Sequence, residues 1–398
     1  MPQACLFAEL SLPLVAVVLL ALVGHGYFWV AIVNRIHGTA SPRYFIDGAT
    51  LVCLFAFLAM PLLILWNWPE VLERWSTGLG YPAGFSVRYF QFCAAWCVGA
   101  FLLKAVTAKE RNDPHTFRLW RREPVAGVAD SGAAMFHGVY PQLLARIPGN
   151  QILDLQVEHK RLAIPRLHAK HAGLTIAHVS DFHMTGRVDR RWFKTVVREV
   201  NRLQADVIAI TGDIVEHADC VPWLADTVCQ FQARLGVYFI LGNHDRYVGL
   251  DPTRDKLVDA RHICLSGRWL VDQWNGAPVL LAGNERPWFR EVGNLEEAPP
   301  RDVDNLPLRL FLLHTPDQIG WARRHDADLV LAGHTHGGQI CIPLLGAVAC
   351  PSLHGTRYSD GVYREGLAVM HVTRGLSART PLRWNCPPEI ALLELVTA

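Results

Sequence analysis

Five short apolar segments between residues 174 and 332 each run directly into polar side chains that can bind a metal ion. They are residues 174–180, 207–211, 237–241, 308–313 and 329–332. Each is rich in Val, Ile and Leu and too short for a typical helix, which favours buried strands. In sheets whose strands are joined by helical crossovers, the loops at the carboxyl ends of the strands meet at one edge, and sites form there. The five segments therefore predict a sheet with one site at its edge.

The stretches between these segments predict helices. Over 189–203, residues such as Trp192, Val196 and Val200 fall on one stripe, while the arginines fall elsewhere. A shorter helix is predicted over 318–324, entered after a proline. The alternation of strands and helices predicts an α/β (α+β) fold.

The polar residues at the five strand ends offer nitrogen and oxygen ligands and no thiolate. They are Asp181, His183, Asp213, Asn243, His314, His334 and His336. Imidazole suits zinc, iron, manganese or nickel. Two histidines two positions apart are common in cores and on surfaces, so the final pair alone is weak evidence. The whole set exceeds the needs of one tetrahedral ion and fits two ions about 3.5–4 Å apart, bridged by a carboxylate.

Through these motifs, the chain resembles the calcineurin-like metallophosphoesterases over roughly residues 150–398. The resemblance rests on D-x-H, GD, GNHD, a lone histidine and GHTH, at residues 181–183, 212–213, 242–245, 314 and 333–336. It implies a four-layer β-sandwich of two mixed sheets flanked by helices. It also implies a hydrolase acting on phosphoester or phosphoanhydride bonds, with two divalent ions (Mn, Fe, Zn or Co) that provide hydroxide at neutral pH.

The resemblance further implies a role for each motif residue. The first ion would take Asp181, His183 and His336; the second would take Asn243, His314 and His334, with Asp213 bridging the two. His244 would donate a proton to the leaving oxygen or hydrogen-bond to the phosphoryl group, and Asp245 would orient His244. General acid help of this kind contributes roughly 10²–10⁴-fold to the rate.

For several neighbouring polar residues, the sequence gives weaker evidence of a role in the site. Arg246 follows the GNHD motif and could hold a substrate phosphate, since arginine makes bidentate contacts. His354 could border the site; the alternative is a purely structural role in a terminal β-hairpin. His178 is expected to be a packed, hydrogen-bonded core histidine. Glu216 and His217 follow the GD loop, where contact with substrate and a solvated loop are both open.

The end of the chain resembles one branch of this family. The GHTHGGQ sequence at 333–339 and the CPPEI ending at 386–390 carry that resemblance. The branch is membrane-anchored and bacterial, and includes phosphodiesterases and UDP-2,3-diacylglucosamine pyrophosphatases. The implied substrate is a lipid-linked phosphodiester or pyrophosphate. Nucleotide-type phosphodiesters and phosphoproteins are alternative substrates, and a non-catalytic metal-binding scaffold is the alternative function.

The first hundred residues differ in composition from the rest. Three spans are expected at about 10–33, 48–66 and 87–106; the first two contain no Asp, Glu, Lys or Arg. A bilayer needs about 20 apolar residues. Buried helices of a soluble domain are the alternative, but these segments have no polar face. The expected organisation is a transmembrane region over 1–107, a basic juxtamembrane linker over 108–149 and a catalytic domain over 150–398.

Lys and Arg set the expected orientation, because cytoplasmic loops carry their excess. The densest group lies at and after the end of the third span: Lys104, Lys109, Arg111, Arg118, Arg121 and Arg122. It predicts a multi-pass membrane protein with an outside N-terminus and a cytoplasmic catalytic domain. If residues 89–103 do not cross, the orientation inverts.

Charge and cysteine content narrow the remaining functions. The net charge is +2, and no basic stripe with interleaved aromatic residues occurs, which argues against general nucleic-acid binding. The ten cysteines form no CxxC motif, so no disulfide framework is expected. The sequence carries no signal for an oligomeric state.

Overall fold

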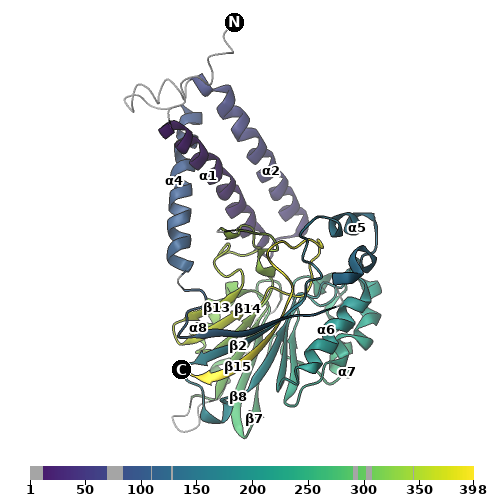
Figure 1. Cartoon of the computed structure of the whole chain (residues 1–398). Helices are drawn as coiled ribbons and strands as arrows, with labels where there is room; N and C mark the ends of the chain where they lie inside the picture. The colour runs from purple at the N-terminus through teal and green to yellow at the C-terminus, as the bar shows by residue number, and fades with distance from the viewer. Residues whose placement is uncertain are drawn as a thin grey trace. The chain divides into compact units, whose positions relative to one another are not determined.

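The structure, a computed structural model, describes residues 12–69, 84–108, 110–126, 129–289, 295–301, 307–343 and 345–398. The chain divides into two compact units, Met1–Lys109 and Glu110–Ala398. Among the described residues, the first unit contains three long helices, and the second unit contains all the strands (Figure 1).

The first unit confirms the three expected apolar segments as helices long and apolar enough to cross a membrane. They are α1 (Leu12–His37), α2 (Arg43–Trp66) and α4 (Phe85–Ala108), with mean hydropathies of 2.2, 2.5 and 1.5 over their most apolar windows. Helix α2 begins before its uncharged segment, and there Arg43 and Asp47, one turn apart, form an ion pair of 3.5 Å.

The second unit contains a seven-stranded mixed sheet in the order β1-β2-β15-β3-β4-β5-β6. Its strands are β1 (Phe117–Pro124), β2 (Gln156–Ile164), β3 (Thr175–Val179), β4 (Val207–Thr211), β5 (Gly236–Ile240), β6 (Ile263–Cys264) and β15 (Glu389–Thr397). Strands β3 to β6 are parallel, whereas β15 runs antiparallel to β3 and parallel to β2. The C-terminal strand thus completes the middle of the sheet.

A second, six-stranded sheet follows the order β13-β14-β10-β9-β8-β7. Its strands are β7 (Trp269–Trp274), β8 (Ala277–Asn284), β9 (Leu308–Leu313), β10 (Leu329–Ala332), β13 (Gly361–Glu365) and β14 (Ala368–Val372). The four central strands β8, β9, β10 and β14 are parallel. A short hairpin, β11 (Cys341–Ile342) with β12 (Gly346–Ala347), stands apart from both sheets.

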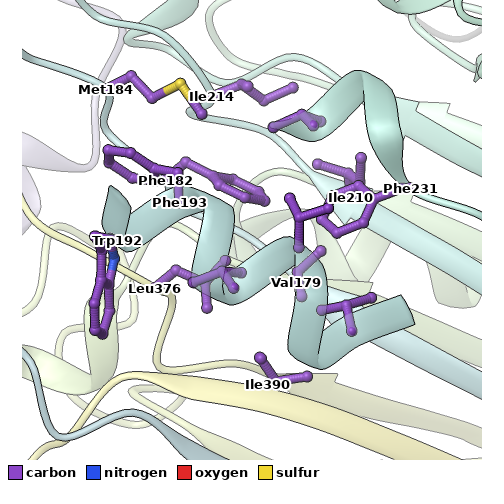
Figure 2. Close-up of a cluster of buried hydrophobic side chains, with 14 of the residues drawn as sticks. Val179, Phe182, Met184, Trp192, Phe193, Ile210, Ile214, Phe231, Leu376 and Ile390 are labelled. Atoms are coloured by element: carbon purple, nitrogen blue, oxygen red, sulfur yellow. The ribbon is translucent and has the colours of Figure 1, made fainter. Parts of the chain in front are cut away.

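Both faces of each sheet are buried, which makes four layers. Alternate residues of one strand belong to different cores: Val207 faces the core between the sheets, while Ile208 faces the helical side. Helix α6 (Arg190–Arg202) covers the seven-stranded sheet, and Figure 2 shows its Trp192 and Phe193 in that core. Helix α8 (Ile319–Arg324) packs against the six-stranded sheet. Helices α5 (Val139–Ala145) and α7 (Leu250–Asp259) complete the unit. The expected sandwich is confirmed.

Continuous apolar runs predicted the central strands well. Strands β4, β9 and β10 have the expected bounds, and β3 and β5 shift by about one residue at their ends. Helix α6 also occupies the expected segment, and its N-cap Asp189 accepts a hydrogen bond of 2.8 Å from the backbone N–H of Arg191.

The expected linker over 108–149 was wrong for residues 117–124. They form β1, which pairs antiparallel with β2 at the edge of the seven-stranded sheet. An edge strand exposes most of its side chains, so its composition resembles that of a solvated linker. Side chains of β1 contact the neighbouring strand β2. Arg122 forms an ion pair of 2.8 Å with Glu158, and Trp120 lies against the guanidinium of Arg161.

Candidate metal centre

The carboxyl ends of parallel strands from both sheets meet at one edge of the sandwich, and every predicted ligand lies just beyond such an end. Five of these residues adopt a left-handed backbone with φ between 45° and 70°: Asp181, His183, Asp213, His334 and His336. This region is uncommon for residues other than glycine, and such strain concentrates at functional sites. The sharp turns allow each loop to direct its side chain back into the edge.

The first cluster contains Asp181, His183 and His336, all buried. The two Nε2 atoms of His183 and His336 lie 3.1 Å apart. Oδ1 of Asp181 lies 4.0 Å from His183 Nε2 and 3.8 Å from His336 Nε2. Both imidazoles and the carboxylate thus face one small volume.

The second cluster contains Asn243, His314 and His334. The amide oxygen of Asn243 lies 2.9 Å from His314 Nε2, and the rings of His314 and His334 have centroids 4.9 Å apart. The other ring nitrogen of His314, Nδ1, donates to the backbone carbonyl of Thr211 at 2.7 Å. That bond directs Nδ1 away from the cluster and leaves Nε2 facing it, where Nε2 can bind a metal ion once it has lost its proton.

Asp213 lies between the two clusters and faces both. Its Oδ2 is 3.5 Å from His183 Nε2, and its Oδ1 is 3.4 Å from His314 Nε2. Oδ1 also accepts the backbone N–H of His244 at 2.8 Å. One carboxylate therefore contacts both groups of ligand atoms.

Unpaired acceptor atoms show that this donor set fits metal ions. Oδ2 of Asp213 and Nε2 of His334 are buried without a hydrogen-bond partner among the described residues. Buried polar atoms are normally paired, so such atoms at one edge call for a ligand. The close approach of the His183 and His336 nitrogens has the same explanation, because two imidazole lone pairs repel each other unless a proton or cation lies between them.

The electrostatics agree with a site that holds positive charge. Burial alone would lower the pKa of His314, but the Asp213 carboxylate outweighs it and raises this pKa to about 9. For His334 and His336, burial dominates and lowers the pKa well below the ordinary value, which keeps both rings neutral. Neutral imidazoles beside carboxylates are the protonation states that bind metal ions.

Close backbone approach at one glycine makes this arrangement possible. Gly333 links β10 to the two last histidines, and a Cβ at this position would lie 2.1 Å from Ser180 Oγ and 2.7 Å from Asp181 Oδ2. The glycine therefore allows the loop after β10 to pass against the loop after β3.

The sequence left two settings open for Glu216, a substrate contact or a solvated loop. In the structure its side chain is only 8% exposed and contacts two histidines of the site. Its Oε2 lies 3.2 Å from His183 Nδ1 and 3.3 Å from His244 Nδ1, and its Oε1 lies 3.1 Å from Arg379 Nε. Burial would raise the pKa of this carboxyl, but hydrogen bonding with His183 and His244 lowers it overall. Its position three residues after the GD motif was the available signal, because that loop turns back over the site.

The resemblance implied that Asp245 orients His244, and in the structure the contacts of this carboxylate are with backbone N–H groups. Its buried carboxylate accepts backbone N–H groups from Ile214, Val215 and Gly242 at 2.9, 2.8 and 2.7 Å. It therefore ties the loop after β4 to the loop after β5. The acid beside the His244 ring is Glu216.

The two candidate substrate contacts lie in different settings. Arg246 follows the motif and is partly exposed, with its guanidinium 5.7 Å from the ring of Tyr247, which itself lies against His244. His354 is exposed and contacts the ring of Tyr358. Among the contacts of the described residues, none joins His354 to the histidine clusters. An unexpected neighbour is Trp288, whose ring lies 4.6 Å from that of His334 and 5.4 Å from that of His314.

Comparison with known proteins agrees with this geometry. The family model for calcineurin-like phosphoesterases matches residues 174–338. The phosphodiesterase YaeI of Escherichia coli is 30% identical over 231 residues, which cover 56% of this chain and 83% of that protein. The UDP-2,3-diacylglucosamine pyrophosphatase LpxG of Chlamydia trachomatis is 24% identical over 60% of this chain and 88% of its own.

A further relative matches a larger share of the chain. A transmembrane protein with a metallophosphoesterase domain from Danio rerio is 23% identical over 81% of this chain and 75% of its own length. The fold, the clustered ligands and these relatives agree. The chain belongs to the calcineurin-like metallophosphoesterases and is a hydrolase of that family.

Proposed function

We propose that this protein is a membrane-anchored phosphoesterase with two metal ions, which hydrolyses a phosphodiester or pyrophosphate bond of a lipid-linked substrate. One observation carries the catalytic part of the proposal. Two groups of ligand atoms lie on either side of Asp213, whose two oxygens face one group each.

The proposed ligand sets follow these groups. The first ion is held by Asp181, His183 and His336, and the second by Asn243, His314 and His334, with Asp213 shared. When bound, the divalent cations supply positive charge toward the phosphate oxygens and a water of lowered pKa.

His244 is the proposed proton donor. It is less buried than the ligands, and its Nδ1 lies 3.3 Å from the Glu216 carboxylate. The Glu216 carboxylate lies beside this nitrogen, so the other ring nitrogen is left to deliver a proton to the leaving oxygen. Asp245 acts as a positioning residue, because it holds the loops that carry Asp213 and His244.

Two observations support a lipid-linked substrate. The chain carries three helices long and apolar enough to cross a membrane, ending just before the catalytic unit begins. The relative LpxG is named for a reaction on UDP-2,3-diacylglucosamine, a nucleotide-linked lipid. Nucleotide-type and protein substrates remain the competing candidates, and a non-catalytic scaffold is disfavoured because all the motif residues are present.

The test uses the full chain in detergent, with metal content and hydrolysis measured together. We expect two divalent ions per chain, turnover of bis-p-nitrophenyl phosphate with manganese, and preference for UDP-2,3-diacylglucosamine over water-soluble phosphodiesters in a substrate panel. Asp213→Asn should lose metal and activity together. Asp219→Asn is the matched control, since its carboxylate is 89% exposed in the following loop.

Each outcome bears on a different part of the proposal. Folded protein with two ions and no turnover of any phosphoester would contradict the enzymatic role. Full activity in Asp213→Asn would contradict the bridging role. Equal rates on nucleotide and lipid-linked substrates would overturn the substrate assignment alone.

A further inference from the structure

Helix α5 exposes an apolar face in the catalytic unit. Val139, Leu143 and Ile147 recur every four residues and are 75%, 57% and 42% exposed, and Tyr140 beside them is 53% exposed. Residues four apart lie on one side of a helix and its continuation. Contiguous exposed apolar side chains of this kind mark an interaction surface.

Two further exposed side chains extend this face. Trp384 is 49% exposed, and its indole Nε1 lies within 3.3 Å of a Cβ built on Gly149, two residues beyond Ile147. Ile340 is 40% exposed and forms a β-bridge with Trp384. The apolar face is thus defined by Val139, Tyr140, Leu143, Ile147, Ile340 and Trp384.

The apolar face borders the metal centre. The backbone N–H of Gln339, next to Ile340, donates to the carbonyl of His336 at 3.1 Å. On the other side, Arg383, next to Trp384, donates to the same carbonyl at 3.4 Å. Whatever covers this face therefore lies beside the ligands of the first cluster.

Charge in these segments is one-sided. Residues 138–153, 339–359 and 379–388 contain no Asp or Glu. Arg357 and Arg379 pair with glutamates from outside these segments, whereas the exposed Arg146 is in none of the ion pairs of the described residues. The face also carries a tyrosine and a tryptophan, the residue types that gather where a bilayer meets water. Apolar side chains with interfacial aromatics and cations fit an anionic lipid surface.

We propose that the apolar face rests in the headgroup region of the bilayer that anchors the chain, so that the metal centre takes its substrate directly from the lipid surface. This inference rests on the proposed membrane anchoring. It assigns α5, Ile340 and Trp384 to membrane contact and names the partner as an anionic phospholipid surface. A lipid-linked substrate would then reach the ligands from the same surface of the bilayer.

Photocrosslinking in the full chain tests this contact. The variant Leu143→p-benzoylphenylalanine is reconstituted into vesicles of phosphatidylethanolamine and phosphatidylglycerol, irradiated, and its adducts are identified by mass spectrometry. The matched control is Leu367→p-benzoylphenylalanine, since Leu367 is 51% exposed but precedes β14 at the opposite edge, roughly 16 Å away along the strand. We expect several-fold more phospholipid adduct at position 143 than at 367.

The outcomes separate this inference from the proposed function. The membrane contact would be overturned by any of three results in protein that hydrolyses bis-p-nitrophenyl phosphate. These are adducts at position 143 with a second copy of the chain, equal amounts of lipid adduct at positions 143 and 367, or no lipid adduct at 143. A folded protein could also give strong lipid adducts at position 143 but no turnover of any phosphoester. That result would support the membrane contact and would contradict the phosphoesterase proposal.

Discussion

At the residue scale, the sequence motifs predicted which side chains meet, because each lies directly after a buried apolar strand. Asp181, Asp213 and the final histidines are in contact, as expected. The expectation that His178 is a core histidine is also confirmed, since it bonds His371 and Thr211. The contacts of Glu216 were not predictable, because they depend on how the loop folds back after the left-handed turn at Asp213.

The proton-donor role of His244 predicts a dependence on the leaving group. In His244→Gln, an amide keeps the size but cannot release a proton. Turnover of a phosphodiester with an alkyl alcohol leaving group should fall roughly 10²–10⁴-fold. Turnover of bis-p-nitrophenyl phosphate should fall far less, because p-nitrophenolate is stable as an anion. Steady-state kcat on both substrates measures the difference.

His217→Gln is the matched control, since His217 is a 60% exposed histidine next to Glu216. It should leave both rates unchanged. Equal losses on the two substrates in His244→Gln would instead assign His244 to holding the site together.

The raised pKa of His314 predicts how stability changes with pH once metal is removed. This pKa is raised from 6.5 to about 9, so its stabilising contribution is complete below pH 6.5 and is lost as the pH rises through about 9. The Tm of EDTA-treated protein should therefore fall between pH 6.5 and 9. Metal-loaded protein should show no such fall, because a ligating imidazole is already neutral. Calorimetry of both forms measures this.

The variant Asp213→Asn tests whether His314 causes this pH dependence, because it removes the carboxylate that raises the pKa of His314. The fall in Tm of the metal-free variant should move to lower pH. Parallel pH profiles for the loaded and metal-free wild-type protein would contradict the assignment of this proton to the ligand cluster.

At the element scale, strands buried on both faces were predictable and the edge strand was not. Strands β4, β9 and β10 read as continuous apolar runs, because each packs between two layers. Strand β1 is held by backbone pairing and surface ion pairs, which leave no apolar run in the sequence. The insertion of β15 between β2 and β3 is a long-range pairing that local patterns do not encode.

The close packing of Gly333, between β10 and the loop that carries His334 and His336, predicts that one added methyl group reduces metal binding and activity. In Gly333→Ala, the new Cβ would lie 2.1 Å from Ser180 Oγ, so the loop after β3 must shift and carry Asp181 with it. Misplacement of about 1 Å near the reacting groups costs roughly 10²-fold in rate. Metal content per chain and kcat should both fall.

Gly320→Ala is the control for this substitution, because Gly320 lies in α8 and a Cβ there meets only the Arg324 side chain at 3.6 Å. It should keep full activity and stabilise the helix by about 0.5–1 kcal/mol. Unchanged metal content and turnover in Gly333→Ala would show that the loops after β3 and β10 can separate without loss of the site.

At the scale of the whole molecule, composition predicted a helical region and a catalytic region, but not their boundary. The helical unit ends at Lys109, and the catalytic unit uses residues 111–112 and 117–124, which lie in the segment expected to be a linker. The reason is physical: these residues join the sheet through backbone hydrogen bonds, which their basic side chains do not reveal.

The charge distribution around the three apolar helices predicts which side of the membrane the catalytic unit occupies. The segment around and after the end of α4 carries the densest group of Lys and Arg, so it should be cytoplasmic. Three crossings then place the loop between α1 and α2 on the same side and residues 70–83 outside. Green fluorescent protein should fluoresce when fused after residues 40 and 398 but not after 80. Alkaline phosphatase should show the opposite pattern, because it is active only outside the cytoplasm. An active phosphatase after residue 398 would place the metal centre outside, and fluorescence of the fusion after residue 40 in the same experiment would mean that α4 does not cross.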